Sequence, residues 1–460
     1  MMPFRQLIPK LAGLLLLLLG SLPAQGFSLL GPFTTWQTTP LGYNLVATEQ
    51  GGPMDLGEDY RYTLPTVTYG FDESFLTFFG TDGVQAVDKA FQILNNLPTA
   101  ANINLAAYPP GNAALLNFQA QALGVRDLKS TVLSLMVEQL GLADPVRFTW
   151  TLRDIQPNLN NTATNYWVVR RNFDPVSRFY SSFVNGTLYT YRIRHFTTPL
   201  VFTDAVEQTS DPAQENDRHL PVAGRSPAPG EFYTGLTQDD VGGIKFLLSS
   251  TRYHIETINP SVLLKTNTTI SPWTPRGGTN ANTNITTLIA TGVRGGVEKI
   301  TFQKLLFDSL LGLSHSVTNE WTDRVRVLTN NTFSSQVLQR VSTNVDILFT
   351  ADDLGLTPLT FVPLTLTRSV MTFVNNAARN QTPPATLLNG PGEIHPPVLV
   401  TFNRIGEFIV NSNFQNPFLD EANATRAFVW GSFDGTVTPP IIYPNTLSLQ
   451  ALEQQIGLRR

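Results

Sequence analysis

Hydrophobic positions follow one another without interruption near the start of the chain and become periodic only later. An apolar run from Leu11 to Leu19 follows the basic residues Arg5 and Lys10, and small residues come after the run. This order predicts a secretory signal peptide over residues 1–26, with the mature chain beginning near Phe27. The run is too short to span a bilayer. We therefore expect a secreted or periplasmic protein.

Strand and helix periodicities appear after this leader. Residues 27–60 are a lead-in segment rich in Pro, Gly and Thr, with few periodic positions. Val67, Tyr69 and Phe71 then alternate with small or polar residues, which predicts a half-buried strand over 66–71. Apolar residues at helical spacing predict four helices. They are a helix capped by Asp82 that ends before Pro98, and helices over 113–123, 127–140 and 238–249.

Period-two patterns return between these helices. Apolar residues at 146, 148, 150 and 152 alternate with Arg and Thr, which predicts an amphipathic strand over 146–153. Asn185-Gly186 lies between two strand-like runs and predicts a β-hairpin, because both positions of such a turn need a positive φ. Thr237 and Asp240 form a capping-box-like pair at the start of the helix over 238–249.

From about residue 258 the pattern is β-rich, with one helix expected over 303–311. The expected strands are 285–290, 298–302, 324–328, 345–349, 398–402 and 427–430. Together these patterns predict an α+β fold. We expect an α+β domain over 61–258, with an antiparallel sheet and three to four helices, followed by a β-rich domain over 259–460.

Composition narrows the function classes. The chain is 42% hydrophobic and only 14% charged, so it can bury a sizeable core. It has no cysteine, which excludes disulfides, thiol nucleophiles and thiolate metal sites. The net charge is −4 and no cluster of Lys and Arg forms a stripe, so we expect no nucleic-acid partner. No second apolar run is long enough for a membrane span after the signal peptide is cleaved.

Candidate catalytic and metal-binding residues are scattered. No two histidines are three or four residues apart, so no helical metal-binding pair exists. The histidines are His195, His219, His254, His315 and His395. Adjacent carboxylates occur at Asp72-Glu73, Asp239-Asp240 and Asp352-Asp353. Sequence neighbours point apart, so none of these pairs is interpreted as an acid–base pair. Asp239-Asp240 is expected in the first turn of a helix, where negative charge offsets the helix dipole, and Asp352-Asp353 is expected to cap a helix in the same way.

Two loops have a superficial likeness to known sites. Residues 211–217 gather oxygen ligands but lack the spacing and the glycine of an EF-hand loop. Residues 431–435 contain a serine between glycines, but its position does not fit the G-x-S-x-G motif. No catalytic residue, cofactor-binding residue or metal ligand is therefore assigned, and no cofactor is expected.

Aromatic residues are the remaining candidates for a binding surface. Four aromatic residues are expected on strands that also carry four arginines. The aromatic residues are Tyr166, Trp167, Tyr189 and Tyr191, and the arginines are Arg170, Arg171, Arg192 and Arg194. Such a face can stack on sugars or peptides. Alternatively, it is one wall of the core with its polar reverse side.

Three segments, in the right order, resemble secreted zinc proteases of the matrixin type. Residues 67–91 are similar to their opening strand and helix, 133–144 to the end of their zinc helix (H-E-x-x-H-x-L-G-L-x-H), and 235–244 to their closing helix. The chemistry of that family is missing, because its ligand positions fall on Ser134, Glu138 and Asp144 and its catalytic glutamate on Leu135. The clearest strands also follow this helix, whereas that family places its main sheet before it. The resemblance thus implies a degenerate scaffold at best.

The whole chain also resembles a family of large, uncharacterised secreted bacterial proteins, which implies export but no biochemical role. The leading hypothesis is an exported, non-catalytic binding or structural protein of the cell envelope or extracellular matrix. Its partner would be an unknown protein or polysaccharide. The alternative is a divergent or inactive hydrolase on a matrixin-like scaffold that lacks the zinc ligands.

Overall fold

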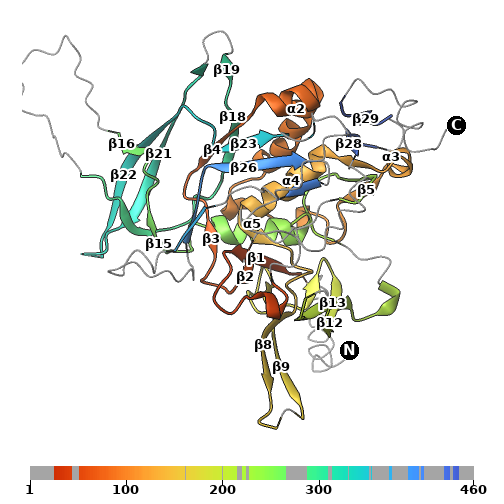
Figure 1. The fold of residues 1–460 in the computed structure, drawn as a ribbon. Coiled ribbons are helices and arrows are strands. Elements are labelled where there is room, and N and C mark those ends of the chain that lie inside the picture. The colour runs from red at the N-terminus through yellow and green to blue at the C-terminus, as the bar shows by residue number, and fades with distance from the viewer. Residues whose placement is uncertain are drawn as a thin grey trace, which may run out of the picture.

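The strand predicted over 66–71 is confirmed as β4 (Thr66–Phe71), and it lies inside a five-stranded sheet of the computed structural model (Figure 1). The strand order is β18-β4-β23-β26-β27, and the pairings are parallel except at β27. The other strands are β18 (Thr301–Lys304), β23 (Ile347–Thr350), β26 (Val398–Asn403) and β27 (Gly406–Phe408). In this sheet β4 contributes Val67, which is fully buried, to the main core.

The structure describes most of the chain between residues 25 and 444, with gaps. The described residues are 25–43, 51–160, 162–198, 200–214, 220–223, 227–265, 287–308, 313–329, 331–351, 354, 372–375, 392–403, 406–408, 429–435 and 439–444.

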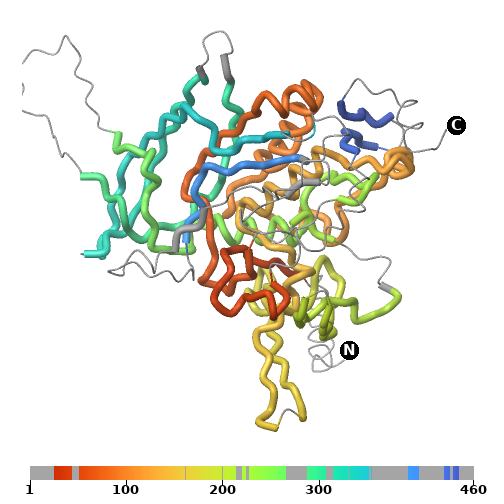
Figure 2. Tube along the Cα trace, in the orientation of Figure 1, coloured from red at the N-terminus to blue at the C-terminus, as the bar shows by residue number. Residues whose placement is uncertain are grey.

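The central sheet joins segments that are far apart in the sequence. β4 comes from the expected first domain, whereas its neighbours β18 and β23 come from the expected second domain. Figure 2 shows this directly, since the orange, cyan and blue segments lie side by side in one sheet. The boundary near residue 258 stays a prediction, but strands from both sides of it share this sheet.

Three predicted helices are present with well-defined caps. α4 (Leu128–Gln139) and α5 (Gln238–Leu248) confirm the predictions over 127–140 and 238–249, and Thr237 and Asp240 form the expected capping box. α2 (Glu73–Asn95) begins earlier than predicted, because Asp72 and not Asp82 accepts the N-terminal N–H of Phe75. The chain changes direction at Gly80, whose φ is 60°.

Aromatic side chains on α2 hold this helix against the central sheet. Phe75, Phe79 and Phe91 are at most 1% exposed. The rings of Phe75 and Phe79 lie 6.0 and 5.6 Å from that of Phe402 on β26. Burying each such ring stabilises the fold by about 1.5–3 kcal/mol. This aromatic layer is the centre of the main core.

Two helix predictions are wrong. The segment expected as a helix over 113–123 contains β5 (Ala114–Leu116) and only a short α3 (Phe118–Ala122), because Asn117 caps the helix and stops it from extending backwards. Within the segment expected as a helix over 303–311, residues 303 and 304 belong to β18 and residues 307 and 308 form β19 (Phe307–Asp308), while residues 309–311 lie outside the described residues. Short apolar runs do not distinguish helices from strands, and here pairing with β4 decides the outcome.

Several strand boundaries also differ from prediction. The alternation over 146–152 begins in a turn, since Asp144 accepts the N–H of Val146, and the strand β8 starts only at Thr151. The strand expected over 285–290 lies at 291–294 instead, as β17, with residues 285 and 286 outside the described residues. The lead-in segment 27–60 contains buried strands. Of these, β1 (Phe27–Gly31) pairs with β2 (Gly52–Met54), β7 (Leu142–Ala143) and β10 (Asn172–Phe173).

A second five-stranded sheet has the order β15-β17-β21-β22-β16. Its strands are β15 (His254–Thr257), β17 (Thr291–Arg294), β21 (Val317–Arg326), β22 (Phe333–Ser342) and β16 (Val262–Leu264). It stands beside the central sheet at the left of Figure 1. The expected α+β fold, rich in strands, is therefore confirmed.

The remaining strands form hairpins and small sheets. They are β1 (Phe27–Gly31), β2 (Gly52–Met54), β3 (Tyr60–Arg61), β6 (Val125–Asp127), β7 (Leu142–Ala143), β8 (Thr151–Pro157), β9 (Thr164–Val169), β10 (Asn172–Phe173), β11 (Phe183–Val184), β12 (Thr187–Phe196), β13 (Phe202–Thr209), β14 (Glu231–Tyr233), β20 (Leu313–Ser314), β24 (Thr372–Asn375), β25 (Gly392–His395), β28 (Val429–Ser432) and β29 (Ile441–Ile442).

The hairpin predicted from Asn185-Gly186 is confirmed. These two residues connect β11 to β12, with φ values of 43° and 80°. β12 continues into a longer hairpin with β13. The β8–β9 hairpin contacts β13 and projects from the lower end of the body (Figure 1).

Candidate binding surface

The residues at the matrixin-like positions do not fit a zinc ion. Ser134 is buried and donates its hydroxyl to the carbonyl of Val222 at 2.9 Å, and Glu138 is buried on the same helix. Asp144 accepts the N–H of Val146. None of these positions supplies an imidazole. Within the part of the chain that the structure describes, no group of three His, Asp or Glu side chains is arranged to hold a metal ion.

The described histidines lie in separate places. His195 shares a 2.8 Å hydrogen bond with Thr203, and His395 shares one of 2.8 Å with Glu393. His254 is buried, while His219 lies outside the described residues. His315 follows β20.

A buried charged network connects β3 and β15. We call it the Asp59 network: Asp59, Arg61, Arg252, His254 and Glu256. Arg61 binds Glu256 at 2.7 Å, and Arg252 binds Asp59 at 2.7 Å. Burial raises the pKa of Glu256 to about 7 against the opposing effect of Arg61. Burial, together with the positive charges of Arg61 and Arg252, lowers the pKa of His254 to about 3.

The charged side chains of the Asp59 network bind one another and nearby backbone carbonyls. Arg61 also donates to the carbonyls of Arg252 and Arg294, at 3.0 and 3.1 Å. A charge in this position is stable only when it is paired and hydrogen-bonded. We interpret the network as a joint between two segments of the fold.

The described adjacent carboxylates have structural roles. Asp239 and Asp240 lie in the first turn of α5, as expected, whereas the capping role of Asp72 was not predicted. Asp72 caps α2, and Asp239 and Asp240 are buried in the first turn of α5. Asp239 accepts the N–H groups of Gly26 and Asn185 at 2.9 and 2.6 Å. Asp240 accepts those of Val222 and Ala223. Asp352-Asp353 lies outside the described residues.

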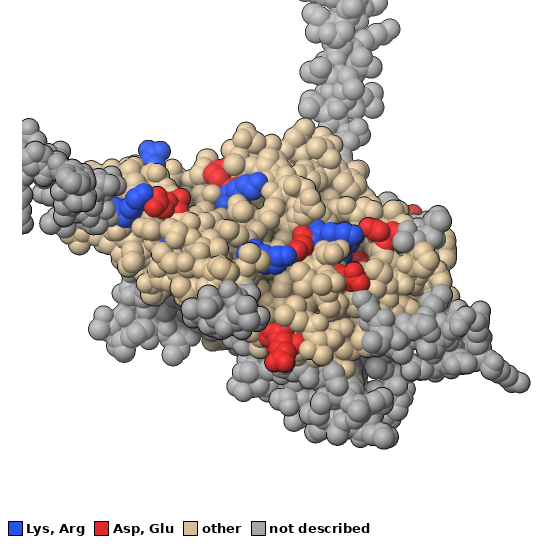
Figure 3. Space-filling model, turned by 90° about the horizontal axis from the view of Figure 1, so that it is seen from above, with Lys and Arg blue, Asp and Glu red and all other residues tan. Residues whose placement is uncertain are grey.

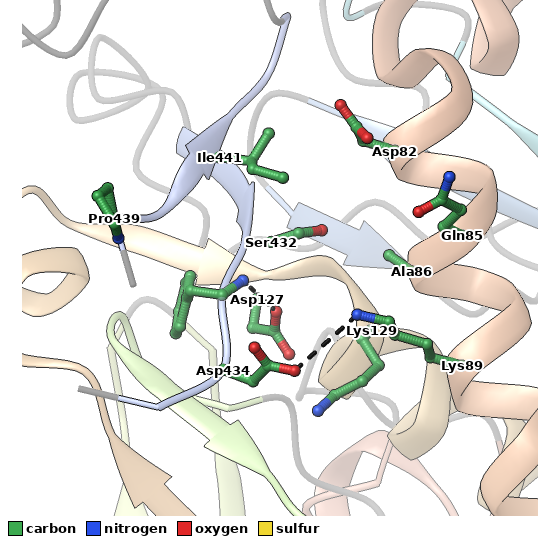
Figure 4. Close-up of a pocket in the computed structure, with 11 residues that line it drawn as sticks. Asp82, Gln85, Ala86, Lys89, Asp127, Lys129, Ser432, Asp434, Pro439 and Ile441 are labelled. Atoms are coloured by element: carbon green, nitrogen blue, oxygen red, sulfur yellow. Dashed lines mark hydrogen bonds and ion pairs between the residues drawn. The ribbon is translucent and has the colours of Figure 1, made fainter. Parts of the chain in front are cut away.

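The serine between glycines lies beside a hollow of about 210 Å³ between α2, the start of α4 and β28 (Figure 4). Ser432 shares a 2.7 Å hydrogen bond with the hydroxyl of Tyr443, which cannot serve as a general base in the way that an imidazole does. Asp127, also in the wall, caps α4 by accepting the N–H and hydroxyl of Ser130. The hydrogen bonds of Ser432 and Asp127 thus stabilise the fold.

In the loop at 211–217, Asp211 accepts the N–H of Ala213 at 2.9 Å. Residues 215–217 of this loop lie outside the described residues.

Exposed hydrophobic side chains are concentrated in one part of the chain. Among the described residues, ten of the 21 large hydrophobic side chains that are exposed belong to residues 159–201. They are Leu159, Tyr166, Trp167, Val176, Phe179, Tyr180, Leu188, Tyr191, Leu200 and Val201. Single exposed hydrophobic residues need no explanation, but a concentration of this kind indicates an interaction surface.

Four side chains in or next to this region contact one another in succession, and we call them the Arg170 ladder: Tyr191, Trp150, Arg170 and Tyr180. The rings of Tyr191 and Trp150 lie 5.1 Å apart. The guanidinium of Arg170 lies 5.4 Å from the ring of Trp150 and 5.9 Å from that of Tyr180. Tyr191 and Tyr180, at the two ends, are 37% and 46% exposed.

Hydrogen bonds fix the ladder in position. The indole N–H of Trp150 donates to the carbonyl of Tyr189 at 3.1 Å. The hydroxyl of Tyr180 donates to Asp55 at 3.1 Å, and Arg171 forms an ion pair of 3.4 Å with the same carboxylate. A surface whose side chains are already ordered loses little conformational entropy when it binds a ligand.

A β-bulge places another arginine over an aromatic ring. The register of β8 and β9 shifts between Leu152 and Asp154, which leaves Arg153 as the extra residue. Its guanidinium lies 4.3 Å from the ring of Trp36. Cation–π contacts of this type stabilise exposed arginines by about 0.5–1 kcal/mol.

The structure divides the aromatic residues that the sequence analysis grouped together. Tyr166 and Trp167 are exposed on β9, and Tyr191 belongs to the ladder, but Tyr189 is 1% exposed and belongs to the core. Tyr189 and Tyr191 are two positions apart and so lie on the same side of β12, which is buried at Tyr189 and exposed at Tyr191. The expected core wall and surface face thus describe successive parts of one strand. Trp150 and Tyr180 were not predicted as members. Trp150 was expected on the strand over 146–153 but lies in the turn before β8, and Tyr180 lies in a loop.

The arginines of the predicted face are divided as well. Arg170 is in the ladder, whereas Arg171 and Arg194 form ion pairs with Asp55 and Asp204. Arg192 is exposed on β12.

The face seen from above in Figure 3 has a different character. Most of it is formed by uncharged residues, and positive and negative side chains occur in small mixed groups.

Comparison of this chain with protein families, with curated proteins and with solved structures finds no match. Among the described helices, none is both long enough and apolar enough to cross a membrane.

Proposed function

We propose that this protein is an exported, non-catalytic binding protein that recognises its partner through the Arg170 ladder and the strands around it. The observation that carries this proposal is the ladder itself, a row of ordered aromatic and guanidinium groups with exposed rings at both ends. Partly exposed, pre-ordered aromatic side chains are typical of surfaces that bind sugars or peptides.

The projecting β8–β9 hairpin supports the same proposal. Residues 164–167 are all exposed, so both faces of β9 are open to solvent near its end. A two-stranded ribbon with an exposed Trp167 is only marginally stable by itself. A partner that covers this ribbon would bury the indole and stabilise it.

Retention on insoluble polysaccharides tests the proposal. The mature chain, beginning near Phe27, should be retained by at least one member of a panel of chitin, cellulose, xylan and cross-linked polygalacturonate. Tyr191→Ala should weaken that retention about tenfold, because it removes one stacking ring of the ladder. Its matched control is Tyr253→Ala, since Tyr253 is 52% exposed but lies beside Phe333 in the second sheet.

Equal retention of the two variants would contradict the proposal. So would turnover of any of these polysaccharides that a single substitution abolishes, because a binding protein has no such chemistry.

A further inference from the structure

The stretch of sequence that carries the Arg170 ladder has more positive than negative side chains, and Asp55, Asp204 and Glu207 lie beside it from other segments. Residues 150–201 contain six arginines, no lysine and two aspartates, whereas the whole chain has a net charge of −4. The arginines are Arg153, Arg170, Arg171, Arg178, Arg192 and Arg194. Such a local surplus attracts anions.

Four of these arginines are not neutralised by an ion pair with a described carboxylate. Among the described residues, no carboxylate forms an ion pair with Arg153, Arg170, Arg178 or Arg192, whereas Arg171 and Arg194 are paired. Three of the four lie over aromatic rings, namely those of Trp36, of Trp150 and Tyr180, and of Phe246. A guanidinium held by its flat face still presents N–H groups at its edge, in the geometry that a carboxylate accepts.

Backbone geometry supports this arrangement at two of the four positions. Arg178 has a φ of 62°, which is rare for a residue other than glycine. Arg153 is placed by the β-bulge described above. Local strain and bulges of this kind are found preferentially at functional positions.

The ladder combines this charge with apolar ring faces. Arg170 donates to the hydroxyl of Ser182 at 3.5 Å, and the exposed rings of Tyr191 and Tyr180 lie at the two ends of the row. A uronic-acid polymer repeats both matching features, because every unit has an apolar C–H face and a carboxylate. An acidic peptide supplies carboxylates on flexible side chains without ring faces, so it matches only the charge.

We propose that the ligand of the Arg170 ladder is an anionic, uronate-containing polysaccharide, with a carboxylate of the polymer bound by the guanidinium of Arg170. This inference rests on the proposed function and specifies its partner. Tyr191 and Tyr180 would contact sugar rings on either side of that carboxylate. Arg153, Arg178 and Arg192 would contribute the surrounding positive charge.

Binding isotherms with one polymer in two charge states test this inference. The probes are polygalacturonate and the same polymer with its carboxylates methyl-esterified, titrated into the mature protein. We expect the free-acid form to bind at least about tenfold more tightly, because each lost charge-assisted hydrogen bond is costly. Its affinity should also fall as salt is raised, since the contact is partly solvent-exposed.

Substitutions identify the arginine responsible. Arg170→Ala should weaken binding of polygalacturonate about tenfold or more, and Arg170→Lys should recover only part of the loss because it lacks the planar fork. The matched control is Arg324→Ala, since the guanidinium of Arg324 also lies over a ring, 4.6 Å from that of Phe333, but in the second sheet. Thermal unfolding of each variant checks that the fold is retained.

The outcomes separate the two proposals. If both forms of the polymer bind equally and Tyr191→Ala still weakens binding, the charge assignment is wrong while the binding function stands. If poly-glutamate binds through Arg170 and polygalacturonate does not, the partner is an acidic protein and this inference is overturned. If no probe responds to substitution at Arg170 or Tyr191, both proposals are wrong.

Discussion

At the scale of single residues, the Asp59 network shows how burial determines charge. His254 is 5% exposed and faces Arg61, Arg252 and Asp59. Removing an imidazolium from water beside two guanidinium groups is costly, and Asp59 compensates only partly. His254 therefore remains neutral until its pKa of about 3, well below its ordinary value of 6.5.

The pH dependence of stability follows from this shift. Between pH 6.5 and about 3 the unfolded chain protonates His254 and the folded chain does not, so the free energy of unfolding falls as the pH is lowered. The free energy of unfolding of the wild type minus that of His254→Gln should accordingly become smaller from pH 7 to pH 4. Urea unfolding at several pH values measures it.

Glu256 affects the pH dependence of stability in the opposite direction. Its pKa is raised from 4.5 to about 7, so its contribution to stability is present below pH 4.5 and is lost as the pH rises through 7. Because Glu256 is present in both proteins, its contribution largely cancels in the difference. A difference that stays constant with pH would show that His254 is protonated in the folded protein.

At the scale of elements, the β11–β12 hairpin depends on backbone geometry. Gly186 has a φ of 80°, and no atom lies within 4 Å of where a Cβ would be. Gly186→Ala should therefore lower the free energy of unfolding by about 1 kcal/mol through backbone strain alone. Gly235→Ala is the matched control, because Gly235 has equal space without a positive φ. Equal unfolding midpoints for the two variants would contradict this account.

Elements whose ends are marked by capping or turn residues could be predicted from the sequence. The caps Asp127 and Thr237 place α4 and α5, and Asn185-Gly186 places the hairpin, because neighbouring residues supply the hydrogen bonds or the turn geometry. The strand β5 could not be predicted, since its partner β14 is about 117 positions away in the sequence. β18 overlaps the strand predicted over 298–302, and only its end was mistaken for a helix.

The candidate site could be predicted only in part. Tyr191 and Arg170 could be predicted, because both belong to the aromatic residues and arginines that are expected together on strands. Trp150 and Tyr180 reach the ladder from a turn and a loop. The alternation over 146–152 marks Trp150 as a strand residue, but it does not indicate that Trp150 lies beside Arg170. The position of Arg153 depends on a β-bulge, which the sequence does not signal.

At the scale of the whole molecule, the central sheet makes the two halves of the chain depend on one another. β4 is flanked by β18 and β23, so residues 27–258 by themselves would leave both edges of β4 unpaired. The contacts of Phe91 with Phe302 and Phe349 also join the two halves of the chain. Removing the second half exposes this core.

A fragment of residues 27–258 should therefore lack a cooperative unfolding transition that residues 27–460 possess. Thermal unfolding followed by near-ultraviolet circular dichroism compares the two. A sharp transition in the fragment, with native-like aromatic signals, would support independent domains instead.

The central claim is that the Arg170 ladder is the surface at which this protein binds its partner. Hydrogen exchange measured with and without oligogalacturonate tests it most directly. We expect slower exchange in the segments around Trp150, Arg170, Tyr180 and Tyr191, and no change around the hollow that contains Asp127. Protection at that hollow, with an unchanged ladder, would contradict the account.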